Sequence, residues 1–298
     1  MDIMSSSFIG MNRPFGSQSM VEPLRRVLVK RPDQAFVVDD AAMWHYSDVP
    51  NLEIARQEHD DFVAILRRAG AEVFFHIEHQ PGRADAIYVH DPAIVTEKGA
   101  VILRPGKDLR RGEEAAMARR LAELGVPVTY ALHDGAVAEG GDLLWIDRHT
   151  LAVGQGFRTN AEGLLQLAKA LKGLEVQLIP VQLPYHTGPE ACLHLMSLIS
   201  ILNQELAVCY RPLMPVPFWE YLSQRGFRLI TVPDGEFASL GTNVLALAPG
   251  KCLMLDGNPI TRQRLEKAGC QVLTYRGNEI SLKAEGGPTC LTRPILRG

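Results

Sequence analysis

Several features that mark common classes of protein are absent from this sequence. Its five cysteines contain no C-x-x-C pair, which argues against a zinc ribbon and against the disulfide framework of a small secreted protein. No apolar run approaches the roughly 20 residues of a membrane-spanning helix. The N-terminus also lacks the basic and apolar segments of a signal peptide. We therefore expect a cytoplasmic protein with reduced thiols.

A basic block is absent as well. The net charge is -3 and the Lys and Arg residues are dispersed, so nucleic acid is not an expected partner. With 298 residues, 46% of them hydrophobic, the chain can bury a core without disulfides or metal ions. No H-E-x-x-H pattern is present, and we expect neither a metal nor an organic cofactor.

The sequence contains a repeated unit of strand, strand, helix and strand, recognised from apolar runs and helical periodicity. Its four copies occupy residues 93–130, 143–179, 199–232 and 244–274. An earlier strand–helix–strand segment, 27–75, and the C-terminal tail supply elements for a fifth copy. Two expected helices begin with cap chemistry, at Asn160 and at Asn258 before Pro259.

Repeats of roughly 50 residues favour an α/β propeller, here with five blades, over one doubly wound sheet. A plain α/β sandwich is the alternative, because strand–helix alternation alone is common. Residues 1–20, rich in Ser, Gly and Asn, are expected to form a flexible N-terminal arm. Residues 21–298 are expected to form a single catalytic domain.

One polar residue stands near the start of each copy, at intervals of roughly 50 residues. These residues are Asp91, Glu139, His194, Asn243 and Cys290. If the copies surround an axis, equivalent positions converge on one central cavity. An acid, a histidine and a cysteine would then meet there, which is what nucleophilic catalysis with a positioned base requires.

Each of these residues also has a structural explanation when taken alone. His194, between two leucines, could be a hydrogen-bonded core histidine, and the Glu139–Asp142 cluster could be a tight turn. Cys290 follows two glycines and a proline, which indicates an exposed turn, although a structural role is open there too. The other four cysteines lie in or beside apolar runs and are predicted to be core residues: Cys192, Cys209, Cys252 and Cys270.

Seven motifs in order resemble one family over nearly the whole chain, from residue 22 to residue 294. They are EPLRRVLVKRP, VHDPAIV, LRPGKDLRRGE, EGGD, GFRTNAEG, LHL and GGPTCLTRP. Together they resemble the dimethylarginine dimethylaminohydrolases, within the guanidino-group-modifying superfamily that includes arginine deiminases and glycine amidinotransferases. The resemblance implies a five-bladed α/β propeller with pseudo-fivefold symmetry.

The resemblance also implies residue roles. Cys290 matches the family's nucleophile, His194 its general acid/base, and Glu139 the carboxylate that grips the guanidinium. Four further positions match substrate-binding residues: Asp91 and Asp85 on the guanidinium side, and Arg110 and Arg158 at the substrate α-carboxylate.

Two departures from the family pattern lie beside this pocket. His90 replaces an acid that many relatives have before the aspartate, and Gly140 stands where an alanine is common. Both leave the preference for N-alkyl groups open.

The activity implied is hydrolysis of the guanidinium group of arginine or an N-methylated arginine, giving citrulline and ammonia or an alkylamine through an S-alkylthiouronium intermediate. An amidinotransferase shares the same residues and stays an alternative, and a non-enzymatic ribosome-binding propeller is a more distant one. The expected partner is a small guanidino compound, and a homodimer is left open.

Overall fold

The computed structural model describes residues 14–189 and 192–298. Its strands form five three-stranded sheets, four of which follow the chain directly. Their strands are β3 (Ala93–Thr96), β4 (Gly99–Ile102) and β5 (Val128–Ala131); β6 (Leu143–Asp147), β7 (Thr150–Gln155) and β8 (Gln177–Gln182); β9 (Ile199–Asn203), β10 (Leu206–Cys209) and β11 (Arg228–Thr231); and β12 (Val244–Ala248), β13 (Lys251–Leu255) and β14 (Gln271–Tyr275). The fifth sheet places β1 (Leu24–Val29) between β15 (Arg293–Arg297) and β2 (Glu72–Phe75).

Every sheet has the same internal order. The first and second strands are antiparallel, and the second and third are parallel. A parallel pair needs a crossover, and a helix provides it in each unit. These helices are α1 (Leu52–Arg68), α2 (Glu113–Glu123), α3 (Ala161–Ala170), α5 (Val216–Gln224) and α6 (Pro259–Lys267). The α/β architecture thus contains the repeated strand–strand–helix–strand unit five times, with the C-terminal strand completing the first sheet.

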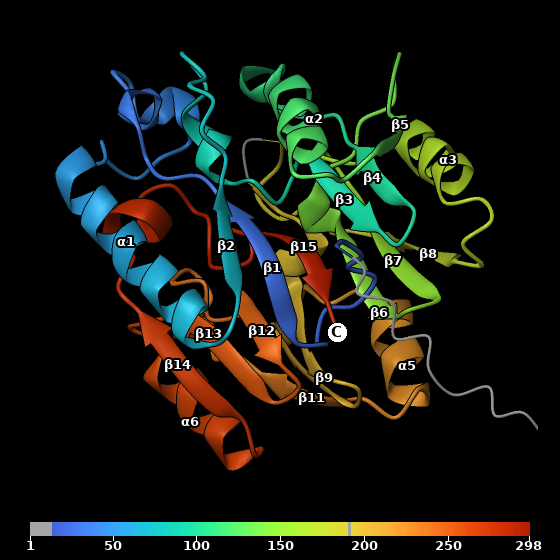
Figure 1. Ribbon diagram of the computed structural model, residues 1–298. Coiled ribbons are helices and arrows are strands. Elements are labelled where there is room, and N and C mark those ends of the chain that lie inside the picture. Colours follow the sequence, from blue (N-terminus) through green and yellow to red (C-terminus); the bar gives the residue numbers. More distant parts are fainter. Residues whose placement is uncertain (1–13, 190–191) are drawn as a thin grey trace, which may run out of the picture.

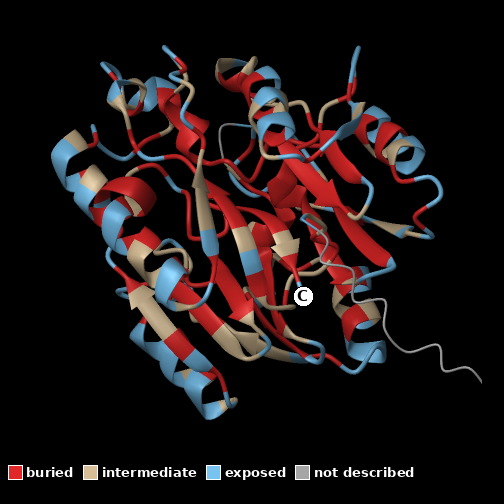
Figure 2. Ribbon diagram, viewed as in Figure 1, coloured by how far each residue is buried: buried red, intermediate tan, exposed pale blue. Residues whose placement is uncertain are grey.

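The crossover helices lie around the outside of the molecule and the strands lie inside (Figure 1). Figure 2 shows the consequence for burial: most strand residues are buried, and each helix exposes its outer face. In α1, for example, Ala55, Phe62 and Leu66 face the interior without exposure, as the helical spacing predicts.

The two predicted helix caps have different outcomes. Asn160 caps α3, because its side chain accepts a hydrogen bond from the Gly163 N–H at 2.7 Å. Asn258 precedes α6 but makes no such bond. The carboxylate of Glu236 accepts the N–H groups of Ile260 and Thr261 instead, at 2.7 Å each. A negative charge from another segment therefore satisfies this helix start, which sequence spacing could not reveal.

Residues 1–13 of the expected N-terminal arm lie outside the described residues. Residues 14–20 follow the edge of the molecule near β15 and β3: the Gly16 N–H donates to the Ile295 carbonyl at 2.8 Å and the Ser17 N–H to the Val95 carbonyl at 3.3 Å. None of the helices in the described part of the chain combines the length and apolar character that crossing a membrane requires.

Candidate active site

A cavity of about 580 Å³ lies where the segments that precede the first strands of the units meet. Four of the five polar residues at the unit starts line it: Asp91, His194, Asn243 and Cys290. The fifth, Glu139, is fully buried and holds His194 from behind. The structure therefore brings together all five residues, although they come from five different units.

Glu139 fixes the imidazole of His194. One carboxylate oxygen, Oε2, lies 2.6 Å from His194 Nε2, and the other accepts the Gly106 N–H at 2.8 Å. His194 itself caps the single-turn helix α4 (Leu195–Leu198), where its N–H donates to Ser197 Oγ at 3.1 Å. Backbone and side-chain contacts together leave the ring one orientation at the cavity wall.

The two glycines after Glu139 allow this close packing. A Cβ on Gly141 would lie 2.5 Å from His194 Nδ1, and one on Gly140 would lie 2.2 Å from the His90 carbonyl oxygen. The close approach at these glycines is to protein groups. His90 points away from the large cavity, and its Nδ1 donates to the Thr292 carbonyl at 2.8 Å.

Asp91 is held by a second network. Its Oδ1 accepts the Gly141 N–H at 2.9 Å, and its Oδ2 pairs with Arg110 Nη1 at 2.5 Å. Arg110 is buried and also grips Glu113, through Nη2 at 2.7 Å and Nε at 3.1 Å. Arg158 is less committed, because its Nη1 lies 3.4 Å from both oxygens of Glu139.

Asn243 positions the segment that carries Cys290. Its side-chain N–H group lies 3.4 Å from the Cys290 sulfur, and its oxygen accepts the Thr289 N–H at 3.1 Å. The thiol therefore faces the cavity from a backbone that another unit anchors.

Sequence reasoning assigned no functional role to Cys192 or Lys107, and both line the cavity. The prediction that Cys192 is a core residue is wrong: it lines the cavity, and its sulfur lies 3.8 Å from His194 Nδ1. The sequence signal that could have placed Cys192 at the cavity is its position two residues before His194. Cys209, Cys252 and Cys270 are buried as predicted.

Lys107 was the second omission. Its ammonium group lies 2.6 Å from Asp85 Oδ2 and 5.0 Å from the centre of the Trp44 ring. The Tyr46 hydroxyl donates to the other oxygen of Asp85 at 2.8 Å. Asp85 therefore lines the cavity, but its charge is paired with Lys107. This lysine belongs to the motif LRPGKDLRRGE.

The buried charged groups shift one another's pKa values. Burial disfavours the charged form of His194, but Cys192 and Asp91 outweigh burial and raise its pKa well above the usual value. Burial would raise the pKa of Glu139, yet its bond with His194 and the charge of Arg158 lower it. His194 is therefore an imidazolium in the unliganded protein and Glu139 a carboxylate.

The surroundings of Cys290 favour its neutral form, the thiol. Burial, followed by the negative charge of Asp91, raises its pKa to about 11, although His194 opposes the shift. A thiol rather than a thiolate is the resting form at neutral pH.

The ligand atoms of Asp91, Glu139 and His194 lie within 4.8 Å of one another, close enough to hold a metal ion. Their hydrogen bonds compete with that role. Asp91 is paired with Arg110, and the His194 nitrogen nearest the carboxylates is engaged with Glu139. A protonated imidazole has no lone pair for a metal.

A cavity with a thiol, an imidazolium and buried carboxylates defines a class of cysteine-containing sites suited to cationic substrates. The fold is that of guanidino-group enzymes. A mutant of the Pseudomonas aeruginosa dimethylarginine dimethylaminohydrolase complexed with citrulline covers 91% of this chain and 99% of its own, with a TM-score of 0.75 and 21% identity. SxtG, an amidinotransferase from Microseira wollei, covers 95% and 97%, with a TM-score of 0.80 and 15% identity.

The sequence comparisons identify the family. The family model described as N,N dimethylarginine dimethylhydrolase, eukaryotic, matches residues 37–297. The N(G),N(G)-dimethylarginine dimethylaminohydrolase of Streptomyces coelicolor is 28% identical over 91% of this chain and 96% of its own. The chain belongs to the dimethylarginine dimethylhydrolase family, whose named relatives are hydrolases acting on C–N bonds of amidines.

Proposed function

We propose that this protein hydrolyses the guanidinium group of arginine or an N-methylated arginine, with Cys290 as the nucleophile. The observation that carries the proposal is the cavity in which Cys290 and His194 meet, with His194 held by Glu139 at 2.6 Å. We also infer that the five units surround this cavity as the blades of a propeller with pseudo-fivefold symmetry. The proposed product is citrulline, together with ammonia or an alkylamine.

Substrate binding follows from charge. A planar guanidinium cation fits beside Asp91, which lines the cavity and can accept its N–H groups, and the buried charge of Glu139 behind His194 helps to balance the charge of the substrate. Arg158 is the better placed of the two arginines to bind an α-carboxylate, because its contacts with Glu139 are long. Arg110 would have to share donors that Glu113 and Asp91 already engage.

The first half-reaction begins with a thiol whose pKa is raised to about 11 by burial and Asp91. A bound guanidinium cation offsets Asp91 and favours the thiolate, so binding promotes deprotonation; the thiol proton is released to solvent, because His194 is already protonated. The thiolate forms a C–S bond with the guanidinium carbon. His194 gives its proton to the departing nitrogen as the C–N bond breaks, which leaves an S-alkylthiouronium on Cys290.

In the second half-reaction, His194 is neutral and accepts a proton from water. The water oxygen bonds to the same carbon, and the C–S bond breaks so that Cys290 leaves as a thiolate, takes up the remaining hydroxyl proton and releases the neutral ureido product. Glu139 stabilises each imidazolium form, so it serves the proton transfers without leaving its buried position.

A product assay tests the proposal. The protein is incubated with arginine, dimethylarginine, agmatine and guanidinoacetate, with and without an added amine, and the ureido product and released amine are measured. We expect ureido product from arginine or dimethylarginine, and its absence with transfer to the added amine would support an amidinotransferase instead.

Substitution of the thiol tests the nucleophile. Cys290→Ser should abolish turnover because an alcohol has no accessible anion near neutral pH, whereas Cys270→Ser, outside the cavity, should retain it. With His194→Gly, the covalent adduct should accumulate on Cys290 and be visible in the intact mass. Undiminished hydrolysis by Cys290→Ser would overturn the proposal.

A further inference from the structure

A second, small cavity of about 10 Å³ lies behind the segment that carries Cys290. Thr289 and Arg293 line this cavity, whereas Cys290 lines the large one, so a single stretch of backbone separates the two. The remaining wall includes Ser19 and apolar side chains such as Trp145. A volume of this size is close to the minimum for one water molecule, so it admits a single small occupant.

Two arginines of β15, Arg293 and Arg297, bring unused donors to this cavity. Both are buried, with exposed fractions of 7% and 8%. Arg293 Nε and Arg297 Nε and Nη2 are buried without a hydrogen-bond partner among the described residues. Their other N–H groups donate to neutral acceptors, such as His90 Nε2 at 3.1 Å and the Glu22 carbonyl at 2.7 Å.

The residues that line the cavity supply few hydrogen-bond acceptors for these donors. None of the residues described around the cavity is an aspartate or a glutamate. Ser19 Oγ already accepts the N–H groups of Val21 and Glu22, at 3.1 and 3.0 Å, so its hydroxyl has a proton to donate. Both guanidinium groups therefore bring unused donors to a space whose lining holds no carboxylate, and a neutral water there would add no negative charge beside them.

Burial of the two guanidinium charges is unfavourable. Burial lowers the pKa of both arginines to about 9, although Asp91 opposes the shift at Arg293 and Glu22 opposes the shift at Arg297; the charge of Arg297 adds to the shift at Arg293. Both remain cationic at neutral pH. Two buried cations that disfavour each other, in mostly apolar surroundings, are stabilised by an anion placed between them.

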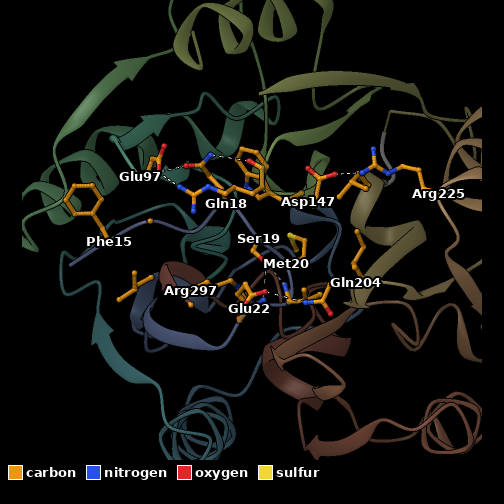
Figure 3. Close-up of a pocket in the computed structure, with 18 of the residues that line it drawn as sticks. Phe15, Gln18, Ser19, Met20, Glu22, Glu97, Asp147, Gln204, Arg225 and Arg297 are labelled. Atoms are coloured by element: carbon orange, nitrogen blue, oxygen red, sulfur yellow. Dashed lines mark hydrogen bonds and ion pairs between the residues drawn. The ribbon is translucent and has the colours of Figure 1, made fainter. Parts of the chain in front are cut away.

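We propose that Arg293 and Arg297 bind a monatomic anion, chloride under ordinary salt conditions, in this cavity. The ion reaches it from a wider cavity of about 540 Å³ on the face of the molecule where residues 15–22 lie beside residues 296–298. The two cavities share Ser19, Met20, Trp145 and Arg297. Figure 3 shows Arg297, Ser19 and Met20 from this wider side. The site would brace β15 and, through it, the backbone behind Cys290.

Thermal unfolding in sodium chloride against sodium gluconate, at constant ionic strength, tests the site. Above the dissociation constant, each tenfold rise in chloride should raise the Tm by about 2 °C for a chain of this length. Arg297→Met should lose this dependence, because it removes two of the unused donors and one charge. Arg225→Met is the matched control, since Arg225 lines the wider cavity in an ion pair with Asp147 and should keep the native dependence.

Crystals of the native protein soaked in sodium bromide give a second test that does not depend on folding of a variant. We expect an anomalous peak within about 3.5 Å of Arg293 Nε and Arg297 Nε. A water molecule there without anomalous signal, or an equal Tm in chloride and gluconate, would overturn the proposal.

Discussion

Alkylation of Cys290 in the unliganded protein should be slow at neutral pH, and its pH dependence can be worked out from the site. Burial and Asp91 raise the pKa of this thiol from an ordinary 9.0 to about 11. At pH 7 the thiolate fraction is then about 100-fold lower than for an ordinary cysteine. The thiolate of higher pKa is intrinsically more nucleophilic, which recovers about tenfold. The net deficit toward a neutral reagent is about tenfold.

The slope of the labelling rate against pH is the more diagnostic measurement. Reaction with iodoacetamide should quicken by about tenfold per pH unit from pH 6 to 9.5, without a plateau. Mass spectrometry of peptides after timed labelling separates Cys290 from Cys192, which shares the cavity. A cationic amidine such as 2-chloroacetamidine should react faster and with a shallower slope, because its own charge stabilises the thiolate.

Two variants should move the pKa of Cys290 in opposite directions. Asp91→Asn removes a charge that raises it and should accelerate labelling by iodoacetamide at pH 7. Asn243→Ala removes a hydrogen bond that lowers it and should slow labelling. A plateau below pH 9 in the native protein, or equal rates in both variants, would refute this account of the site.

Three further predictions concern other residues. Gly141→Ala should cut turnover by about 10²- to 10⁴-fold, because its Cβ would displace the His194 ring, while circular dichroism shows an intact fold; Gly235→Ala, where a Cβ has open space, should have no effect. Arg158→Ala should raise the KM for arginine by about 10- to 150-fold and leave agmatine kinetics unchanged; equal effects on both substrates would argue against a carboxylate contact. His59 is buried and neither of its ring nitrogens has a hydrogen-bond partner among the described residues; burial lowers its pKa from 6.5 to about 4. The unfolded chain therefore binds a proton that the folded protein refuses, and urea titrations should show a stability loss approaching about 3 kcal/mol as the pH falls from 6.5 to 4. His59→Phe should remove this share of the loss and leave the share of His76 and His90, whose pKa values burial also lowers, to about 4 and about 3; an unchanged profile would remove His59 as a cause.

The order of the repeated units was accessible from the sequence because its signals are local. Apolar runs, helical periodicity and turn residues identify each strand and helix over a few neighbouring residues. The regular spacing of Asp91, Glu139, His194, Asn243 and Cys290 then indicated that equivalent positions meet. Even the completion of the first sheet by the C-terminal tail followed from counting incomplete units.

Local sequence signals could not identify hydrogen-bond partners from distant segments of the chain. Glu236 caps α6 in place of Asn258, and Glu139 engages His194, which belongs to the next unit. Which of two nearby carboxylates reaches an N–H group depends on how units pack, and no spacing within one unit carries that information.

The sequence by itself determined the α/β class, the repeated unit and the set of polar residues that converge, because each rests on local periodicity or on regular spacing. Tertiary structure alone decided how those residues face one another. It placed Cys192 beside His194, put Glu139 behind the cavity wall and turned His90 toward Arg293. Those outcomes depend on side-chain directions and on burial between units, which are set only when the sheets pack together.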